Sequence, residues 1–272
     1  MDGKELKKKI LNDLKVKVQE LDSQLGLAVV QVGNNEASNV YIKQKEKTAA
    51  ELGYKFVHKK FDEQISQEEL IREINNLNND PSIDGILVQM PIPEHLDSIV
   101  IQNSVDPNKD IDGLTYINSG RTVANAKGLV PCTPKGIVTL LDHYNIPLEG
   151  ANVVVIGRSL LVGKPIANLL LNRNATVTVC HSKTKNLSDY TKMADIVIVA
   201  VGKDHFLKED MVKDGAVIID VGINRVNDKL YGDVDFDNVS KKASYITPVP
   251  GGVGPMTIAM LATNVYEAHN MK

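Results

Sequence analysis

The sequence is poor in the residues that characterise several classes of protein. Tryptophan is absent and aromatic residues make up only 4% of the chain, which argues against recognition of single-stranded nucleic acid by base stacking. The two cysteines, Cys132 and Cys180, are too few for a disulfide framework and favour the reducing cytoplasm. No apolar run approaches the about 20 residues that a membrane-spanning helix needs. The formal net charge of -3 excludes a strongly basic nucleic-acid binder and an acidic disordered tail.

What the chain does have is the composition of an ordinary globular protein. Its 272 residues correspond to about two domains, and 43% hydrophobic residues are typical of a protein with a substantial core. Residues 1–10 are charged and amphipathic, without the apolar stretch and cleavage site of a secretion signal. We therefore expect a cytoplasmic protein with no membrane partner and no nucleic-acid partner.

Short β-branched runs alternate with longer helical periodicities, which predicts an α/β fold with parallel sheets. Ser66 precedes Glu69 by three positions, a helix-capping pattern that starts one of these helices. In the first half, the sequence predicts strands over residues 27–32, 54–58 and 86–89, and a further helix over 38–52. In the second half, it predicts strands over 153–156, 176–180, 196–201, 216–221 and 244–247, and helices over 163–172, over 255–269 and after Thr133 as N-cap.

Two domains follow from this pattern. The loop-rich stretch 106–131 is interpreted as a junction. We expect an N-terminal catalytic α/β domain over residues 1–119 and a Rossmann-type domain over residues 120–272, in which parallel strands enclose a βαβ unit. The terminal helix, about residues 255–270, is expected to pack back on the first domain. The ligand site is expected in a cleft between the domains, a common place for small-molecule sites.

A glycine-containing turn follows the strand that ends at residue 156. It runs from Gly157 to Pro165 and would let the backbone approach a pyrophosphate at a helix N-terminus. The spacing is not G-x-G-x-x-G, nor is it a Walker P-loop, because Pro165 replaces the magnesium-binding Ser or Thr. ATP hydrolysis is therefore disfavoured, and a strand–helix turn without any ligand is the alternative interpretation.

The end of the next strand indicates which dinucleotide would bind. An NAD enzyme usually carries an Asp or Glu there to bind the ribose 2′-hydroxyl, but the stretch from Cys180 to Thr184 has no acid. Arg158, Ser182 and Lys183 would instead hold a 2′-phosphate through charge-assisted hydrogen bonds. This favours NADP over NAD, unless the stretch is only a polar strand end.

Polar residues in the first half are candidates for chemistry. Tyr41 and Lys45 share one face of a predicted helix and Ser38 lies one turn earlier, although the neighbouring lysines are also compatible with a solvated face. Gln89 follows a buried strand, at the edge where α/β proteins bind ligands. Asp112 precedes Gly113, which is also ordinary turn chemistry.

Two further features complete the set of candidates. The stretch from Pro250 to Pro255 has three glycines and two prolines, so it is either a rigid turn or a loop whose backbone approaches a flat ligand. The six histidines are scattered without metal-ligand spacing, and no metal site is expected.

Together these pieces resemble the bifunctional methylenetetrahydrofolate dehydrogenase/methenyltetrahydrofolate cyclohydrolase family. The resemblance covers essentially the whole chain, in order, and eight ordered motifs are far more specific than any one of them. The small departures, Met90 and Ile92 where the family often has Leu, are conservative. The matching stretches are 37–38 with 41–45, 84–93, 109–113, 131–136, 157–159 with 162–165, 180–184, 221–224 and 248–257.

The resemblance implies a reaction and a set of site residues. The reaction is NADP-dependent oxidation of 5,10-methylenetetrahydrofolate to the 5,10-methenyl form, followed by hydrolysis to 10-formyltetrahydrofolate, by a homodimer. Lys45 would be the general base, Gln89 would orient it, Tyr41 would pack against the folate rings and Asp112 would bind the pterin. The implied substrate-binding residues are Ser38, Tyr41, Lys45, Val88, Gln89, Met90, Asp112, Pro250, Gly251, Gly252, Val253 and Gly254, and the cofactor-binding residues are Gly157, Arg158, Ser159, Ser182 and Ile223.

Two other classes of function are weighed against this one. Another NADP-dependent dehydrogenase with a lysine base would explain the second half of the chain, but not Tyr41, Gln89 and Asp112 together. A catalytically silent nucleotide-binding module would bind NADP without turnover, and the presence of Lys45 and Gln89 argues against it. A chain that retains only one of the two activities is also compatible with the sequence.

Overall fold

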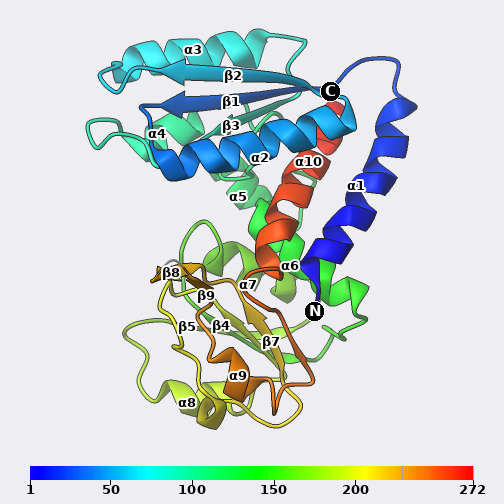
Figure 1. Cartoon of the computed structure of the whole chain (residues 1–272), viewed down its shortest axis with the longest axis vertical. Helices are drawn as coiled ribbons and strands as arrows, with labels where there is room; N and C mark the ends of the chain where they lie inside the picture. Colours follow the sequence, from blue (N-terminus) through cyan, green and yellow to red (C-terminus); the bar gives the residue numbers. More distant parts are fainter. Residues whose placement is uncertain (228, 272) are drawn as a thin grey trace. The chain divides into compact units, whose positions relative to one another are not determined.

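The computed structural model describes residues 1–227 and 229–271, with the side chain at position 37 excepted, as two compact units (Figure 1). Unit 1 consists of Met1–Lys8 and Thr133–Thr257, and unit 2 of Lys9–Cys132 and Ile258–Lys272. Each unit is built on its own parallel sheet. The two-domain α/β fold expected from the sequence is confirmed.

Unit 2 contains a three-stranded parallel sheet of order β2-β1-β3. The central strand β1 is buried along its whole length, because strands pair with both of its edges and helices cover the sheet. In Figure 1, helices α2 and α3 lie on either side of the strands. The elements are β1 (Gly26–Val32), α2 (Glu36–Leu52), β2 (Lys55–Phe61), α3 (Gln67–Asn79), β3 (Gly85–Val88), α4 (Ser98–Asn103) and α5 (Tyr116–Val123).

One core cluster of unit 2 lies between the sheet and helices α3 and α4. Alternate residues of β1, namely Ala28, Val30 and Val32, pack in one cluster with side chains of those helices. Local capping sets where the helices begin: the Asn35 side chain accepts from the backbone of Ser38. The Ser66 side chain accepts from the backbone of Glu69, as its capping pattern predicts.

Unit 1 contains a five-stranded parallel sheet of order β10-β7-β6-β4-β5. The chain leaves β4 toward β5 on one side and continues with β6 on the other, so the topological switch point lies between β4 and β6. A separate two-stranded antiparallel hairpin, β8-β9, also belongs to unit 1. The elements are α6 (Cys132–His143), β4 (Asn152–Ile156), α7 (Gly163–Leu171), β5 (Thr176–Cys180), α8 (Leu187–Thr191), β6 (Ile196–Val199), η1 (Glu209–Met211), β7 (Val217–Asp220), β8 (Asn224–Val226), β9 (Lys229–Tyr231), α9 (Phe236–Val239) and β10 (Tyr245–Ile246).

Two helices contribute residues to both units. Helix α1 (Gly3–Gln19) begins in unit 1, and helix α10 (Val253–His269) contributes its residues from 258 onward to unit 2. There the Tyr54 hydroxyl donates to the carbonyl oxygen of Ala262 at 3.0 Å. The His269 Nδ1 lies 2.9 Å from an Asp84 carboxylate oxygen. No helix of the described residues is long and apolar enough to cross a membrane.

Several boundaries differ from the sequence expectation. Helix α6 already includes Thr133, so that residue is not its N-cap, and its hydroxyl lies 2.9 Å from that of Thr257. Helix α10 starts at Val253 instead of residue 255, because the glycine loop continues directly into the helix. The stretch 106–131 contains α5 and belongs to unit 2, and the compact units divide after Cys132 where the sequence suggested residue 119.

Candidate active site

Helix α2 and strand β3 bring two of the predicted residues of unit 2 into direct contact. The Lys45 Nζ donates to the Gln89 Oε1 at 2.7 Å. Gln89 is fixed where β3 ends, because its backbone N–H donates to the Val30 carbonyl at 2.8 Å and its Nε2 to the Met90 carbonyl at 2.8 Å. The backbone at the end of β3 therefore fixes the Gln89 side chain, and Gln89 in turn orients Lys45.

The other predicted residues on these two elements play different parts. The Ser38 hydroxyl is buried and donates to the Met90 carbonyl at 3.3 Å, which ties the first turn of α2 to the segment after β3. Tyr41 is 46% exposed, so its ring is available to a ligand. Val88 is buried in the core of the sheet and offers a ligand no side-chain surface.

Asp112 reaches this end of the sheet because its chain segment pairs with β3. The Ile86 N–H donates to the Lys109 carbonyl at 2.7 Å, and Ile86 forms an isolated parallel bridge with Asp110. Gly113 follows with φ +67°, and a Cβ atom there would lie 2.6 Å from the backbone of Pro131, so only glycine fits. The turn thus packs tightly against the segment that leads to Cys132.

Electrostatics couple Lys45 to Asp112. Burial lowers the pKa of Lys45, and the negative charge of Asp112 opposes this shift. Burial also raises the pKa of Asp112 to about 6, with the nearby Lys45 lowering it and Asp110 raising it. Both shifts favour the neutral forms, which is typical of groups prepared for proton transfer or ligand binding.

Two residues that the sequence did not single out fix the backbone next to Asp112 by hydrogen bonds. The Asn264 Nδ2 donates to the carbonyl oxygens of Ile111 at 2.7 Å and Val130 at 2.9 Å. The Cys132 thiol donates to the same Ile111 carbonyl at 3.2 Å, and its hydrogen bond with Asp112 lowers the pKa of that carboxyl group. Cys132 stands in one of the quoted motifs, but Asn264 lies in an apolar helix where no sequence signal marks it.

The glycine loop before α10 belongs to unit 1 and has a tightly determined backbone. Gly251 has φ +121°, and its carbonyl accepts from the Gly3 N–H at 2.9 Å. The Gly252 N–H donates to the Pro248 carbonyl at 2.8 Å. Gly251, Gly252 and Val253 are buried, whereas Pro250 and Gly254 are exposed. The exposed edge of this loop is the part that can contact a ligand.

The predicted cofactor turn stands at the switch point of the sheet in unit 1. Gly157 has φ +122°, and a Cβ atom there would lie 2.3 Å from the carbonyl oxygen of Ala200. The Ser159 hydroxyl accepts from the N–H groups of Val162 at 3.2 Å and Gly163 at 3.3 Å. The Ser159 side chain therefore closes the turn at the start of α7, and its neighbour Arg158 is exposed.

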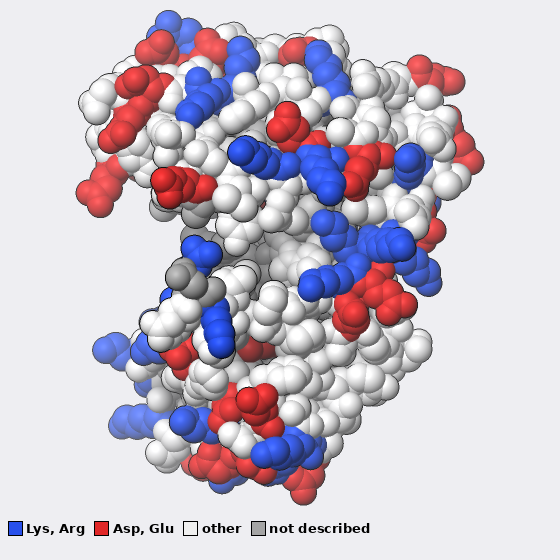
Figure 2. Space-filling view, in the orientation of Figure 1, with Lys and Arg blue, Asp and Glu red and all other residues white. Residues whose placement is uncertain are grey.

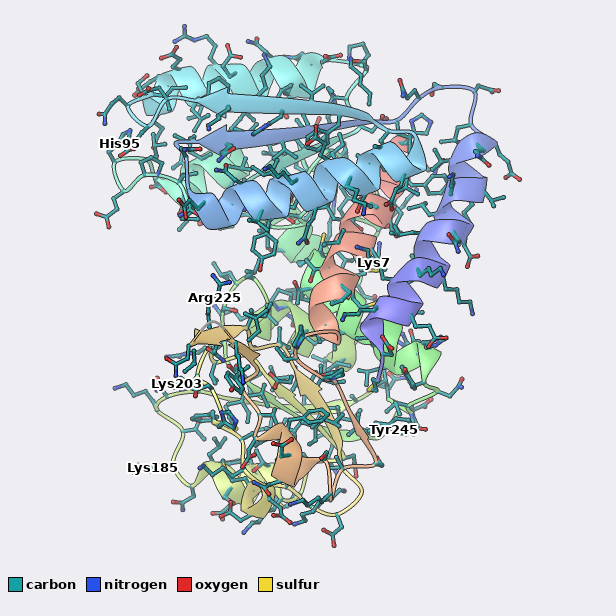
Figure 3. The ribbon with its side chains drawn as sticks, in the orientation of Figure 1. Lys7, His95, Lys185, Lys203, Arg225 and Tyr245 are labelled. Carbon is teal, nitrogen blue, oxygen red and sulfur yellow. The ribbon has the colours of Figure 1, made fainter. Side chains whose placement is uncertain are left out.

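Cationic side chains gather on the loops at the carboxyl edge of this sheet. The segment after β5 is held by the Thr184 hydroxyl, which accepts from the His181 N–H at 2.8 Å, and it leaves Ser182 and Lys183 exposed. Figure 3 labels three more cations, Lys185 after β5, Lys203 after β6 and Arg225 in β8, which sequence reasoning did not single out. Elsewhere on the visible face, Lys, Arg, Asp and Glu are interspersed (Figure 2). This edge suits an anionic ligand.

A half-buried lysine–amide–carboxylate group in one unit and a doubly wound nucleotide-binding sheet in the other define a class, that of dinucleotide-dependent enzymes. Within this class, the chain belongs to the tetrahydrofolate dehydrogenase/cyclohydrolase family. Residues 1–112 match the family's catalytic domain and residues 131–272 match its NAD(P)-binding domain. The resemblance read from the eight motifs is confirmed.

Relatives and solved structures of the same family match this chain along its whole length. The chain is 54% identical over 276 residues to a Bifunctional protein FolD of Campylobacter concisus, which covers 100% of this chain and 98% of the relative. The crystal structure of a bifunctional FolD methylenetetrahydrofolate dehydrogenase/cyclohydrolase from Campylobacter jejuni matches with TM-score 0.97 and 51% identity, over 100% of this chain and 98% of that one. The Trypanosoma brucei dehydrogenase-cyclohydrolase, complexed with NADP cofactor and an inhibitor, matches with TM-score 0.94 and 35% identity, over 100% and 97% of the two chains.

Proposed function

We propose that this chain oxidises 5,10-methylenetetrahydrofolate with NADP and hydrolyses the resulting 5,10-methenyltetrahydrofolate to 10-formyltetrahydrofolate. Family membership over both units supports the pair of reactions. The observation that carries the proposal is the contact between Lys45 and Gln89 at 2.7 Å, beside a carboxyl group whose pKa is raised. Hydride transfer from the methylene carbon moves no proton and needs no base, so a lysine prepared in this way supports the hydrolysis step.

The carboxyl edge of unit 1 fits NADP. Gly157 forms a tight turn in which a Cβ atom would collide with Ala200, and the end of β5 carries Ser182 and Lys183 where an NAD enzyme usually has an acid. Arg158 is exposed beside them and completes a set of donors for a 2′-phosphate. Ile223 is 53% exposed and offers an apolar surface near Gly254. The chemistry that bound NADP supplies is acceptance of a hydride from the methylene carbon.

Hydrolysis is the step that needs proton transfer. Water attacks the methenyl carbon, and a base must take a proton from it. Lys45 fits this role because burial lowers its pKa and so increases the neutral fraction near neutral pH. Gln89 directs the lysine through their hydrogen bond. The cationic substrate would lower the lysine pKa further, because like charges destabilise the ammonium form.

The remaining residues bind the substrate in this proposal. Asp112 accepts from the adjacent amino and ring N–H donors of the pterin, for which a carboxylate has the matching acceptors. Tyr41 packs against the folate rings with its exposed face. Ser38 and Met90 shape the same end of the sheet in unit 2.

Replacement of Lys45 tests the proposal. Lys45→Met keeps the length of the apolar stem but removes the amine, so hydrolysis of 5,10-methenyltetrahydrofolate should fall by about 10²-fold or more. Loss of the methenyl absorbance measures this rate directly. Lys43→Met, an exposed position on the same helix, is the matched control and should hydrolyse normally. Normal hydrolysis by folded Lys45→Met protein would contradict the base role.

The wild-type protein separates the proposed function from its rivals. Reduction of NADP with 5,10-methylenetetrahydrofolate, faster than reduction of NAD, is the expected result. NADP reduction with a hydroxy acid but not with the folate would favour the other dehydrogenase. Binding of NADP without turnover of either substrate would favour the silent module.

We also propose that the protein is a cytoplasmic homodimer. The sheet of unit 1 ends in β5, an edge strand on which Val179 is exposed, and unpaired edges are suited to pairing with another chain. Light scattering on the purified protein measures its mass, and a monomer would contradict the proposal. Two cysteines in 272 residues suit the reducing cytoplasm, where cell fractionation should locate the protein.

A further inference from the structure

Unit 1 contains a buried carboxylate that the proposed chemistry does not use. Asp233 is 0% exposed, and its oxygens accept four hydrogen bonds. Three donors are consecutive backbone N–H groups of the loop after β6: Val201 at 2.6 Å, Gly202 at 2.9 Å and Lys203 at 2.9 Å. The fourth is the Asn224 Nδ2 at 2.9 Å. A buried carboxylate is costly unless it is hydrogen-bonded, so this arrangement fixes the loop to Asp233.

A second carboxylate fixes Asp233 itself. The Asp233 N–H donates to an Asp220 oxygen at 2.8 Å, and Asp220 also accepts from Gly222 at 2.9 Å and Val234 at 2.9 Å. Two backbone positions beside this pair have no space for a side chain. A Cβ atom at Gly222 would lie 2.2 Å from an Asp233 oxygen, and one at Gly232 would lie 1.8 Å from an Asp220 oxygen. The sequence has glycine at both positions, so the carboxylates approach the backbone closely.

The loop that Asp233 holds abuts the cofactor turn. It begins after Ala200, whose carbonyl oxygen would lie 2.3 Å from a Cβ atom at Gly157. The Ala200 N–H also donates to the Ile156 carbonyl at 2.8 Å. The two loops therefore meet at the switch point between β4 and β6, where doubly wound sheets bind dinucleotides. A shift of the loop after β6 would disturb the cofactor turn through this contact.

We propose that Asp233 is a positioning residue for NADP binding, because its carboxylate holds Val201, Gly202 and Lys203 in the conformation that the cofactor requires. It acts through the loop, since it is buried and would not touch the cofactor itself. In Figure 3, Lys203 and Arg225 extend from the two segments that Asp233 joins, the loop after β6 and the hairpin. This inference rests on the NADP part of the proposed function and not on the folate chemistry.

Asp233→Asn is the direct test. Asn has nearly the same size, but its NH₂ group would face backbone N–H donors where an oxygen now accepts from them. NADP affinity, measured by titration calorimetry, should weaken by about tenfold. Hydrolysis of supplied 5,10-methenyltetrahydrofolate requires no NADP and should stay near the wild-type rate. Asp237→Asn, an exposed position on α9, is the matched control and should bind NADP normally.

Two outcomes would overturn the proposal. One is unchanged NADP affinity in folded Asp233→Asn protein. The other is a proportional loss of NADP binding and of hydrolysis with a lowered Tm, which would indicate a general structural role. If Asp233→Asn does not fold, Asn224→Ala removes one of the four donors, and the NADP Kd should then rise by about two- to threefold. An unchanged Kd in that variant also overturns the proposal.

The proposed function and this inference fail in different ways. A wild-type protein that binds NADP but does not turn over folates would contradict the proposed function. The calorimetric comparison of wild type with Asp233→Asn would still decide the role of Asp233.

Discussion

In water, Lys45 and Asp112 would carry opposite charges. In the protein, burial lowers the pKa of Lys45 and raises that of Asp112, so the neutral form of each is favoured. For Lys45 the shift serves the proposed base role, because only the neutral amine accepts a proton. For Asp112 the shift works against the proposed pterin binding, because the ionised form has the full set of acceptors. The attraction between the two groups moderates both shifts. The pH profile of hydrolysis should show how the two pKa shifts combine.

We expect hydrolysis to fall on the acid side with a midpoint near the Asp112 pKa. Burial raises this pKa from 3.8 to about 6, so protonation begins to disable substrate binding well above the range of an ordinary aspartate. Rising pH also increases the neutral fraction of Lys45, because its pKa is lowered from 10.5. Both effects make kcat/KM rise with pH. The measurement is a pH profile of methenyl hydrolysis, corrected for the uncatalysed rate.

Asp112→Asn provides the control for this assignment. Its kcat/KM should be low throughout and should lack the acid-side decline that Asp112 causes in the wild type. A wild-type profile that stays flat between about pH 5 and 7 would contradict the assignment.

At the residue scale, the sequence predicted side chains whose positions follow from regular geometry. The end of a strand placed Gln89 at the ligand-binding edge, and helical spacing placed Lys45 on one face with Tyr41. The family resemblance implied the pairing of Lys45 with Gln89, and the two side chains are in contact. Asn264 and Asp233 were missed, because their partners are backbone groups far away in the chain. A single sequence carries no pattern for such contacts.

At the scale of single elements, the cap of α3 is a feature whose energy can be measured. Ser66 accepts from the Glu69 N–H at 3.2 Å, and the helix packs Leu70 and Ile74 into the core. Ser66→Ala should lower the free energy of unfolding by about 1 kcal/mol. Urea unfolding of the full chain checks this, with Ser23→Ala at an exposed bend as control. Equal midpoints for the two variants would contradict the capping role.

Elements with strong periodicity were predicted well, and short ones were not. The strand over residues 176–180 has the same bounds as β5, and the other predicted strands differ by one to three residues at their ends. β5 is an edge strand and only partly buried, although its apolar run indicated a strand buried on both faces. Helices α4, α5, α8 and α9 and the β8-β9 hairpin were not predicted. Helices of four to eight residues have too few turns to show a period, and their capping depends on contacts such as the N–H of Tyr116 with the Asn103 side chain. For helix α1, the sequence indicated only that residues 1–10 are charged and amphipathic.

At the scale of the whole molecule, the fold separates two tasks. Lys45, Gln89 and Asp112 belong to unit 2, whereas the cofactor turn and the Asp233 cluster belong to unit 1. The sequence predicted separate catalytic and cofactor domains with a boundary at residue 119, whereas the compact units divide after Cys132. Helix α5 lies between the expected junction and the observed one, and Asp110, whose side chain accepts from the Thr115 N–H and the Asn118 Nδ2, fixes it to unit 2. Asp110 stands in one of the matching motifs, but no sequence pattern predicts its hydrogen bonds with Thr115 and Asn118.

This division predicts that defects in the two units are independent. Lys45→Met should reduce hydrolysis without changing NADP affinity, and Asp233→Asn should do the reverse. Residues that share no partner usually have additive effects. The double variant should therefore show the NADP Kd of Asp233→Asn together with the hydrolysis rate of Lys45→Met, measured by calorimetry and by methenyl absorbance. An NADP Kd in the double variant that departs from that of Asp233→Asn by more than about twofold, equivalent to roughly 0.4 kcal/mol of coupling, would show that the base in unit 2 and the cofactor loop in unit 1 act together.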